Sequence, residues 1–419
     1  MRNLVTSVAA AAVALAGSAA FAEDVVVKWL HQQGSEEVRE YWDKLAADYS
    51  ARTDGVTIEV QHIESQSFKA KLTTLLQSND APHFFYSWGG GVMQAQVDSG
   101  TLRDVTAEMG DGWADTFGEA AVGAFTYKDK IWGAPYLANL VGFWYNKQMF
   151  ADAGVVAEDI KTWDDLLVAV EKLKATGVVP IGLGGMQKWP THFYYTHLML
   201  RIGGQQGFVD AVNEVGDGFA GETYIRAGQE FKRLVDLDPF QPGFVAADQN
   251  NMYGALGDGE HAMQLMGSWL YGRQKSKSKD GIGLTDDELG WFPFPMVEGG
   301  AGTAEETLGG INGWLFHKSA PAEAVDFVKY FLSNEVQEDM AKRGWIIPVA
   351  RGADAAIADP FQSEHSARIA NSPYHQIFYD QMLGPDVGLV VNDMAAELAV
   401  GNVSPEDAAA EIQDAWLDR

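Results

Sequence analysis

Cysteine is absent from the 419-residue sequence. Its absence excludes disulfide bonds, thiol nucleophiles and cysteine-ligated metals, and it leaves no cysteine that a lipid anchor could modify. Stability must therefore come from buried apolar surface, which a composition of 47% hydrophobic residues can provide. The length suits two or three domains, or one domain built in two lobes.

Positive charge is scarce in this chain. Fifty-eight Asp and Glu residues outnumber 30 Lys and Arg residues, and the formal net charge is −28. Such a field repels polyanions, so we expect neither nucleic acid nor an anionic membrane surface as a partner. The same field disfavours an anionic small ligand unless local cations override it.

The common catalytic signatures are also missing. The sequence has no GxxxxGK[ST], GxSxG, HExxH or EF-hand motif, and its acidic residues are too numerous for any one pair to indicate glycoside hydrolysis. His192 and His197 lie five residues apart, on different faces of a predicted helix, so we expect no shared metal between them. We expect one of the two to be buried and the other to lie on the surface. The sequence thus predicts no catalytic residue, no metal site and no cofactor.

The first 22 residues differ in composition from the rest of the chain. A single positive charge at Arg2 precedes an Ala-rich apolar run from Leu4 to Ala16, and Ala20-Phe21-Ala22 has the A-x-A form of a cleavage site. This pattern predicts a secretory signal peptide that is cut before Glu23. The run is too short and too weakly hydrophobic for a membrane anchor, which needs about 20 apolar residues. A freely diffusing periplasmic protein is the simplest destination.

Strand and helix patterns alternate along the chain. Val25–Leu30 is a near-continuous apolar run, typical of a strand buried on both faces, and apolar residues between Val38 and Tyr49 recur at helical spacing. Further strands are predicted at Val56–Val60 and His83–Tyr86, with a helix between them at Phe68–Leu76. This order predicts a parallel α/β sheet.

A second α/β series begins at Val141, after a predicted crossing at Pro135. One of its helices starts with a capping-box pattern at Thr162, and another is predicted at Glu222–Val235. The chain then returns to strand and helix material and ends in helices, the last of which starts at Ser404. We predict an α/β protein of two lobes. The first comprises residues 23–135 and about 292–346, and the second comprises residues 136–291 and about 347–419.

Several tryptophans are predicted to lie at the ends of strands. Trp88, Trp189 and Trp269 each follow a strand and precede the start of a helix, and ligands of open α/β sheets bind at the carboxyl ends of strands. Glycine beside them allows close approach, and an indole offers a flat apolar platform with one donor at its rim. A sugar ring, with one apolar face and a hydroxyl edge, is the matching ligand. Three other tryptophans are expected mainly in cores: Trp29, Trp42 and Trp163.

The order and spacing of several segments resemble one family. These segments are the opening strand with Trp29, then Ala81–Trp88, Trp132–Tyr136, Trp144–Lys147 with Thr162–Asp165, Met263–Trp269, Gly309–Gly313, Gly344–Val349 and Gly401–Trp416. Each alone is a weak signal, but together they are specific. The sequence resembles the sugar-binding extracellular solute-binding proteins of ABC importers, the group that includes maltose-binding protein.

This resemblance implies a type II periplasmic binding protein fold, with two α/β lobes joined by hinge segments. The implied protein is a monomer that binds a neutral mono- to oligosaccharide between the closing lobes, without covalent chemistry. It would deliver this ligand to the permease subunits of an ABC transporter in the inner membrane. The implied ligand contacts are His31, Gln32, Gln33, Ser87, Trp88, Gly89, Asn139, Trp189, His192, Trp269, Asn312, Trp345 and Asp386.

The sequence departs from maltose-binding protein at two places. Gln33 and Gly34 replace an acid–base pair after the first strand, and Gly90 and Gly91 replace an Asp-Arg pair after the third. The resemblance therefore does not extend to maltodextrin specificity. Two alternatives stay open: a sensor that presents bound sugar to a chemoreceptor, and a secreted glycoside-active enzyme with two carboxylates facing each other across a cleft.

Overall fold

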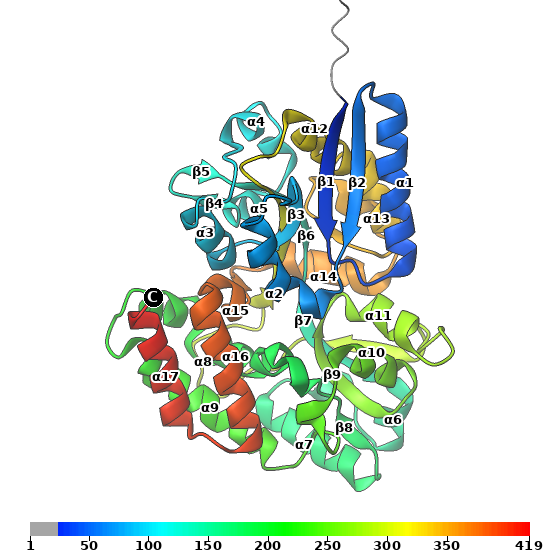
Figure 1. The fold of residues 1–419 in the computed structure, drawn as a ribbon. Helices are drawn as coiled ribbons and strands as arrows, with labels where there is room; N and C mark the ends of the chain where they lie inside the picture. Colours follow the sequence, from blue (N-terminus) through cyan, green and yellow to red (C-terminus); the bar gives the residue numbers. More distant parts are fainter. Residues whose placement is uncertain (1–23) are drawn as a thin grey trace, which may run out of the picture.

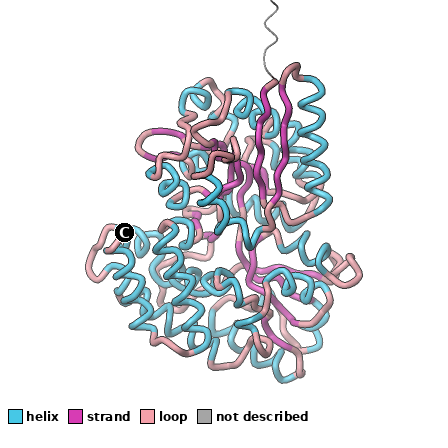
Figure 2. The backbone as a smooth tube through the Cα atoms, viewed as in Figure 1, coloured by secondary structure: helices cyan, strands magenta, loops and turns pink. Residues whose placement is uncertain are grey.

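The computed structural model describes residues 24–419, so the predicted signal peptide at residues 1–22 lies outside the described residues. The chain forms two lobes, each built around its own sheet with helices on the sheet faces (Figures 1 and 2). Within residues 24–419, no helix combines the length and the apolar character needed to cross a bilayer.

The first lobe contains a six-stranded mixed sheet. In spatial order its strands are β13 (Ile347–Pro348), β6 (Gly133–Ala138), β12 (Ile311–Phe316), β3 (Phe84–Trp88), β1 (Val25–His31) and β2 (Val56–His62). As predicted, β1 pairs in parallel with β2 and β3, but β12 is antiparallel to both of its neighbours. A two-stranded hairpin, β4 (Thr126–Tyr127) and β5 (Lys130–Ile131), lies beside this sheet.

Helices pack on the six-stranded sheet through their apolar faces. The helix α1 (Glu36–Arg52) buries the predicted face from Val38 to Tyr49, including Trp42. Trp29 and Trp42 stack with ring centroids 5.3 Å apart, and both are almost fully buried, as expected. The other helices of this lobe are α2 (Ser65–Leu76), α3 (Gly91–Asp98), α4 (Thr106–Gly110), α5 (Glu119–Gly123), α12 (Ala322–Phe331) and α13 (Asn334–Lys342).

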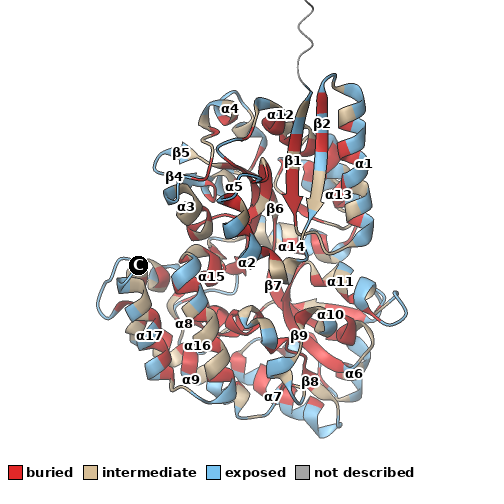
Figure 3. Ribbon diagram, viewed as in Figure 1, coloured by how far each residue is buried: buried red, intermediate tan, exposed pale blue. Residues whose placement is uncertain are grey.

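The second lobe contains a four-stranded sheet inside a larger helical shell (Figure 3). The strand order is β10 (Leu289–Phe292), β7 (Val141–Asn146), β9 (His261–Gly267) and β8 (Val179–Ile181). Its helices are α6 (Lys147–Asp152), α7 (Trp163–Ala175), α8 (Trp189–Val212), α9 (Glu222–Val235), α10 (Gln249–Gly257), α11 (Leu270–Lys277), α15 (Tyr379–Met382), α16 (Pro385–Val400) and α17 (Pro405–Leu417).

Local caps explain where two of these helices begin. The Thr162 side chain accepts from the Asp165 amide at 3.2 Å, and the Asp165 carboxylate accepts from the Thr162 amide at 2.8 Å, which confirms the predicted capping box of α7. The Ser404 hydroxyl accepts from the Asp407 amide at 3.0 Å and caps α17. Each cap satisfies amides that the first helical turn leaves without partners.

The expectation that one of His192 and His197 lies on the surface is wrong. Both belong to α8 and are at most 1% exposed. The reason is that residues 190–202 of α8 are buried on every side, in contact with the sheet and with α9 and α16. His197 stacks on Phe294 with ring centroids 4.4 Å apart.

Within the described residues the chain passes between the two lobes at three places: after β6, before β12 and after β13. The strand β11 (Thr307–Gly309) pairs in parallel with β14 (His375–Ile377), and α14 (Pro360–Asn371) lies between β13 and β14 in the chain. The Asn139 amide donates to the Gly310 carbonyl at 2.9 Å. A Cβ at Gly309 would lie 1.7 Å from the Asn139 oxygen, so only glycine fits this crossing. The lobe boundaries expected after residues 135, 291 and 346 stay a prediction.

Candidate functional site

A cleft of about 790 Å³ lies between the two lobes. From the first lobe, it is lined by the loop after β1, the end of β3, the first turns of α2 and residues of β6 and β12. From the second lobe, the starts of α8 and α11 and parts of α10 and α15 face it. The loop after β1 and the end of β3 lie at carboxyl ends of parallel strands, where open α/β sheets bind ligands.

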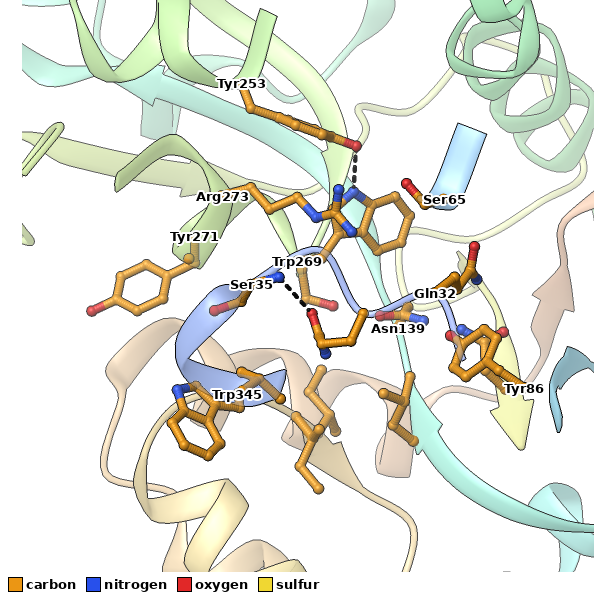
Figure 4. A pocket seen from close by; sticks show the side chains of 18 of the residues that line it. Gln32, Ser35, Ser65, Tyr86, Asn139, Tyr253, Trp269, Tyr271, Arg273 and Trp345 are labelled. Carbon is orange, nitrogen blue, oxygen red and sulfur yellow. Dashed lines mark hydrogen bonds between the residues drawn. The ribbon is translucent and has the colours of Figure 1, made fainter. Parts of the chain in front are cut away.

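The second lobe presents two indoles to this cleft. Trp189 begins α8 and Trp269 immediately precedes α11; their ring centroids are 6.2 Å apart and both side chains are half-buried. The Trp269 Nε1 donates to the Tyr253 hydroxyl at 2.8 Å, which fixes the ring orientation (Figure 4). Phe193 and Phe378 stack on each other at 5.0 Å and pack behind Trp269. Together these rings make a preformed apolar platform.

The first lobe presents uncharged polar groups to the same cleft. Gln32 and Asn139 come from the loops after β1 and β6, Tyr86 from β3 and Asn312 from β12. Burial between the lobes raises the pKa of the Tyr86 hydroxyl, and Asn312, Arg273 and Gln32 offset part of this effect. The phenol therefore stays neutral and can both donate and accept.

A buried carboxylate also lines the cleft. Asp380 on α15 accepts from Lys69 Nζ at 3.1 Å, and His192 Nε2 is 3.9 Å away. Burial by itself would raise the pKa of the Asp380 carboxyl, but the Lys69 cation holds this pKa below its usual value. Burial lowers the pKa of His192, which is therefore neutral at neutral pH. Asp380 is thus an ionised acceptor in this cleft.

A further acceptor comes from the same helix. The Gln381 Oε1 is buried and has no hydrogen-bond partner among the described residues, and Gln381 lines the cleft. Because an unsatisfied buried oxygen costs free energy, this oxygen is suited to receive a donor from a ligand. In residues 24–419, no three His, Asp or Glu side chains gather so as to hold a metal ion.

The lobes touch each other around the cleft. The Asn250 amide donates to Glu64 Oε1 at 3.2 Å, and the Arg273 guanidinium packs on Gly34, where an added Cβ would lie 2.8 Å from its Nη2. On another side, a Cβ at Gly91 would lie 2.4 Å from the Gly384 nitrogen. These contacts bring side chains of both lobes within reach of one small molecule.

Nine of the thirteen predicted contact residues line the cleft, and their contact with a ligand stays a prediction. The nine come from both lobes. They are Gln32, Gln33, Trp88, Asn139, Trp189, His192, Trp269, Asn312 and Trp345.

Four predicted contacts lie outside the lining. His31 is 1% exposed and packs with Trp29 and Trp42, at centroid distances of 5.3 and 4.9 Å. The Ser87 hydroxyl donates to Gln96 at 3.2 Å and points away from the cleft, because neighbouring residues of a strand face opposite sides. Two further residues complete this group: Gly89, which packs on Ala124, and Asp386, which is exposed in the first turn of α16.

Several lining residues were not predicted from the sequence. Tyr86 lies two residues before Trp88 in one strand, and Arg273 lies one helical turn after Trp269, so their periodicity could have identified them. Lys69 and Asp380 are 311 residues apart, and no local pattern links them. Such long-range pairs become visible only in the folded chain.

Comparison with known proteins supports this architecture. Residues 34–338 match the family described as bacterial extracellular solute-binding protein. An uncharacterized ABC transporter extracellular-binding protein of Pyrococcus horikoshii is 25% identical over 389 residues, which cover 90% of this chain and 84% of that protein.

Two solved structures share the fold. A chitin oligosaccharide binding protein has a TM-score of 0.84 and 24% identity, with 94% of this chain and 98% of that chain covered. A structure from work on xylan utilization by Caldanaerobius polysaccharolyticus has a TM-score of 0.85 and 23% identity, with coverages of 93% and 99%. The two-lobed fold and the family resemblance expected from the sequence are confirmed. The chain belongs to the bacterial extracellular solute-binding proteins.

Proposed function

We propose that this protein binds a carbohydrate in the cleft between its lobes and delivers it to the permease of an ABC importer. The observation that supports this most strongly is the pairing of the Trp189 and Trp269 platform with the polar groups of Gln32, Tyr86 and Asn312 across the cleft. Indoles cover the apolar face of a sugar ring, and amide and hydroxyl groups bind its edge. The names of the oligosaccharide-binding relative and of the ABC transporter relative agree with this function.

The size of the platform fits reversible capture. If each indole covers about 80 Å² of ligand at roughly 25 cal/mol per Å², it contributes about 2 kcal/mol. Two such platforms, together with several hydrogen bonds, reach roughly micromolar affinity after the entropic cost of association. A ligand that touches both lobes also stabilises the closed state by its differential affinity for that state.

The proposed role includes no covalent chemistry. Glu37 and Asp380 are the carboxylates among the described residues that line the cleft. A glycoside hydrolase needs a general acid with a raised pKa, whereas the pKa of Asp380 is lowered by Lys69 despite burial. We further propose that the protein acts as a monomer in the periplasm, which it reaches through the signal peptide at residues 1–22.

Calorimetric titration of the mature protein with mono-, di- and trisaccharides tests the proposal. We expect a dissociation constant near the micromolar range for at least one sugar, and fluorescence of the cleft indoles should change at the same stoichiometry. Absence of binding across neutral and acidic sugars would contradict the proposed function. Uptake of the bound sugar by membrane vesicles that carry the permease tests delivery.

A further inference from the structure

The charged residues that line the cleft have the opposite balance from the chain as a whole. Acidic residues outnumber basic residues by 58 to 30 in the sequence. In the cleft lining, four residues are basic and two are acidic. The basic residues are Lys69, Arg273, Lys275 and Arg343, and the acidic residues are Glu37 and Asp380. The cleft is therefore a local cationic region in a strongly acidic protein.

Three of these four cations have carboxylate partners within the protein. Their ion pairs are Lys69–Asp380 at 3.1 Å, Lys275–Asp286 at 3.2 Å and Arg343–Asp339 at 3.1 Å. Arg273 has no carboxylate within ion-pair distance in the part of the chain that the structure describes. Among the basic residues of the described lining, Arg273 is thus the one whose positive charge no carboxylate of the protein compensates.

Arg273 lines the cleft beside Trp269. It lies on α11 one turn after Trp269, is half-buried, and its Cζ is 5.4 Å from the centre of the Tyr253 ring (Figure 4). Its Nη1 donates to Asn250 Oδ1 at 3.4 Å, and the guanidinium reaches the opposite lobe at Gly34.

A guanidinium carries five donors in a planar fork, so donors of Arg273 remain available. The glycine at position 34 matters here because any side chain would displace this group. The charge of Arg273 also acts on Tyr86, since it offsets part of the rise in the pKa of that hydroxyl. Arg273 is therefore electrostatically close to the polar groups of the first lobe.

We propose that the carbohydrate carries a carboxylate, as a uronic acid residue does, and that Arg273 binds this carboxylate beside the Trp269 platform. The inference rests on the proposed function and names its substrate class. A planar guanidinium binds a carboxylate through two parallel hydrogen bonds, which is stronger and more directional than a bond to a hydroxyl. The net charge of −28 led us to expect a neutral ligand. Inside the cleft, the positive charge of Arg273 opposes this negative electrostatic field.

Matched pairs of sugars test this inference. Calorimetry compares oligogalacturonates with their methyl esters, and glucuronate-bearing xylo-oligosaccharides with the unsubstituted oligomers. For a sugar that binds, we expect the acid to bind at least about tenfold more tightly than its neutral counterpart at low salt. The preference should shrink as salt is added.

Variants test whether Arg273 is the side chain that causes the preference for the acidic sugar. Arg273→Gln should abolish it while the neutral sugar still binds, and Arg273→Lys should keep part of it because the charge remains. Arg226→Gln on α9 is the matched control: Arg226 bonds to the backbone of Glu298 outside the cleft, and its loss changes the net charge equally. We expect this control to retain the full preference.

The possible outcomes separate the two proposals. Equal affinity for an acid and its ester would overturn the inference and leave sugar binding intact. A loss of affinity in Arg273→Gln that is equal for both members of a pair would also overturn it, because Arg273 would then serve only as a contact between lobes. If neither acidic nor neutral sugars bind the wild-type protein, the proposed function itself fails.

Discussion

In the first lobe, Trp29, Trp42 and Trp314 are at most 1% exposed and contact one another at centroid distances of 5.3 to 5.6 Å. In the second lobe, Trp189 and Trp269 are half-buried at the cleft. The same residue type thus forms a core cluster at Trp29, Trp42 and Trp314 and lines the cleft at Trp189 and Trp269.

The difference follows from where each indole stands relative to its strand. Trp29 and Trp314 lie inside β1 and β12, so their rings point into the layer between sheet and helices. Trp269 follows the end of β9, and a Cβ at Gly267 would lie 2.1 Å from its ring. Glycine therefore allows the Trp269 ring to fold over the strand end and face the cleft. The contrast between Trp29 and Trp269 is thus one between a ring in the middle of a strand and a ring just after a strand end beside glycine.

Of the substitutions that test this difference between core and cleft tryptophans, Trp29→Ala should have the largest effect. We expect Trp29→Ala to lower the free energy of unfolding by about 3 to 5 kcal/mol, because it leaves a cavity among Trp42, Phe84 and Phe331. Denaturant titration measures this loss. Sugar affinity of the folded fraction should stay within about twofold of wild type, and a selective loss of affinity at full stability would contradict the core assignment.

Trp269→Ala should show the reverse pattern. We expect sugar affinity to weaken by about 2 to 4 kcal/mol if Trp269 is the indole on which the sugar stacks, as proposed. Calorimetry measures the change. Trp416→Ala on α17, half-buried and outside the cleft lining, removes the same side chain without touching the cleft and should leave affinity unchanged. An unaltered dissociation constant for Trp269→Ala would remove this indole from the site.

Asp380 allows the polar side of the second lobe to be tested by pH. We expect Asp380→Asn to lower the free energy of unfolding at pH 7 by about 1 to 2 kcal/mol, because Lys69 is partly exposed and solvent screens the pair.

Because the pKa of Asp380 is lowered in the folded protein, this contribution is fully present above about pH 5. It is lost as the pH falls through the ordinary carboxyl range toward the lowered value. Denaturant titrations of the wild-type protein and of Asp380→Asn between about pH 3 and pH 7 measure the difference in their free energies of unfolding. Asp414→Asn, at an exposed position of α17, should show no comparable dependence. A difference that is constant with pH would argue against an ionic role for Asp380.

Removing the Tyr253 hydroxyl should have the smallest effect on sugar affinity. Tyr253→Phe removes the acceptor for Trp269 Nε1 and should weaken sugar binding by about 0.5 to 1.5 kcal/mol, because the indole orientation is then held by packing alone. Tyr195→Phe removes a buried hydroxyl that donates to the Tyr224 carbonyl at 3.2 Å, outside the cleft lining. Titration calorimetry should find no change in this control, and an equal loss in both variants would indicate a general packing effect.

Much of the fold could be predicted because its signals are local. The capping box at Thr162, the cap at Ser404 and the helix at Glu222–Val235 each depend on residues within a few positions of one another. The alternation of strands and amphipathic helices predicted two α/β lobes for the same reason. The burial of His197 could not be predicted this way, because it depends on elements far along the chain that surround α8.

The site was only partly predictable, since a strand end is located from sequence to within about two residues. This uncertainty decides which side chains face the cleft: Gln32 lines it, whereas His31, one residue earlier, is buried under Trp29 and Trp42. Likewise Asp386 was expected to contact the ligand, but it lies outside the lining, and Asp380 on the preceding helix lines the cleft instead. Arg273 was not predicted, although it lies one helical turn after Trp269 on α11.

The crossing segments have a mechanical consequence. Backbone hydrogen bonds tie Asn139 to Gly310 and join β11 to β14, so strands from three distant parts of the sequence form one narrow ribbon between the lobes. A ribbon of paired strands twists easily but resists stretching and sideways shear, because both would break its hydrogen bonds. We therefore expect rotation about the ribbon axis to be the relative motion of the lobes that costs the least free energy. A bulky side chain at Gly309 should hinder this rotation without changing the residues that contact a ligand.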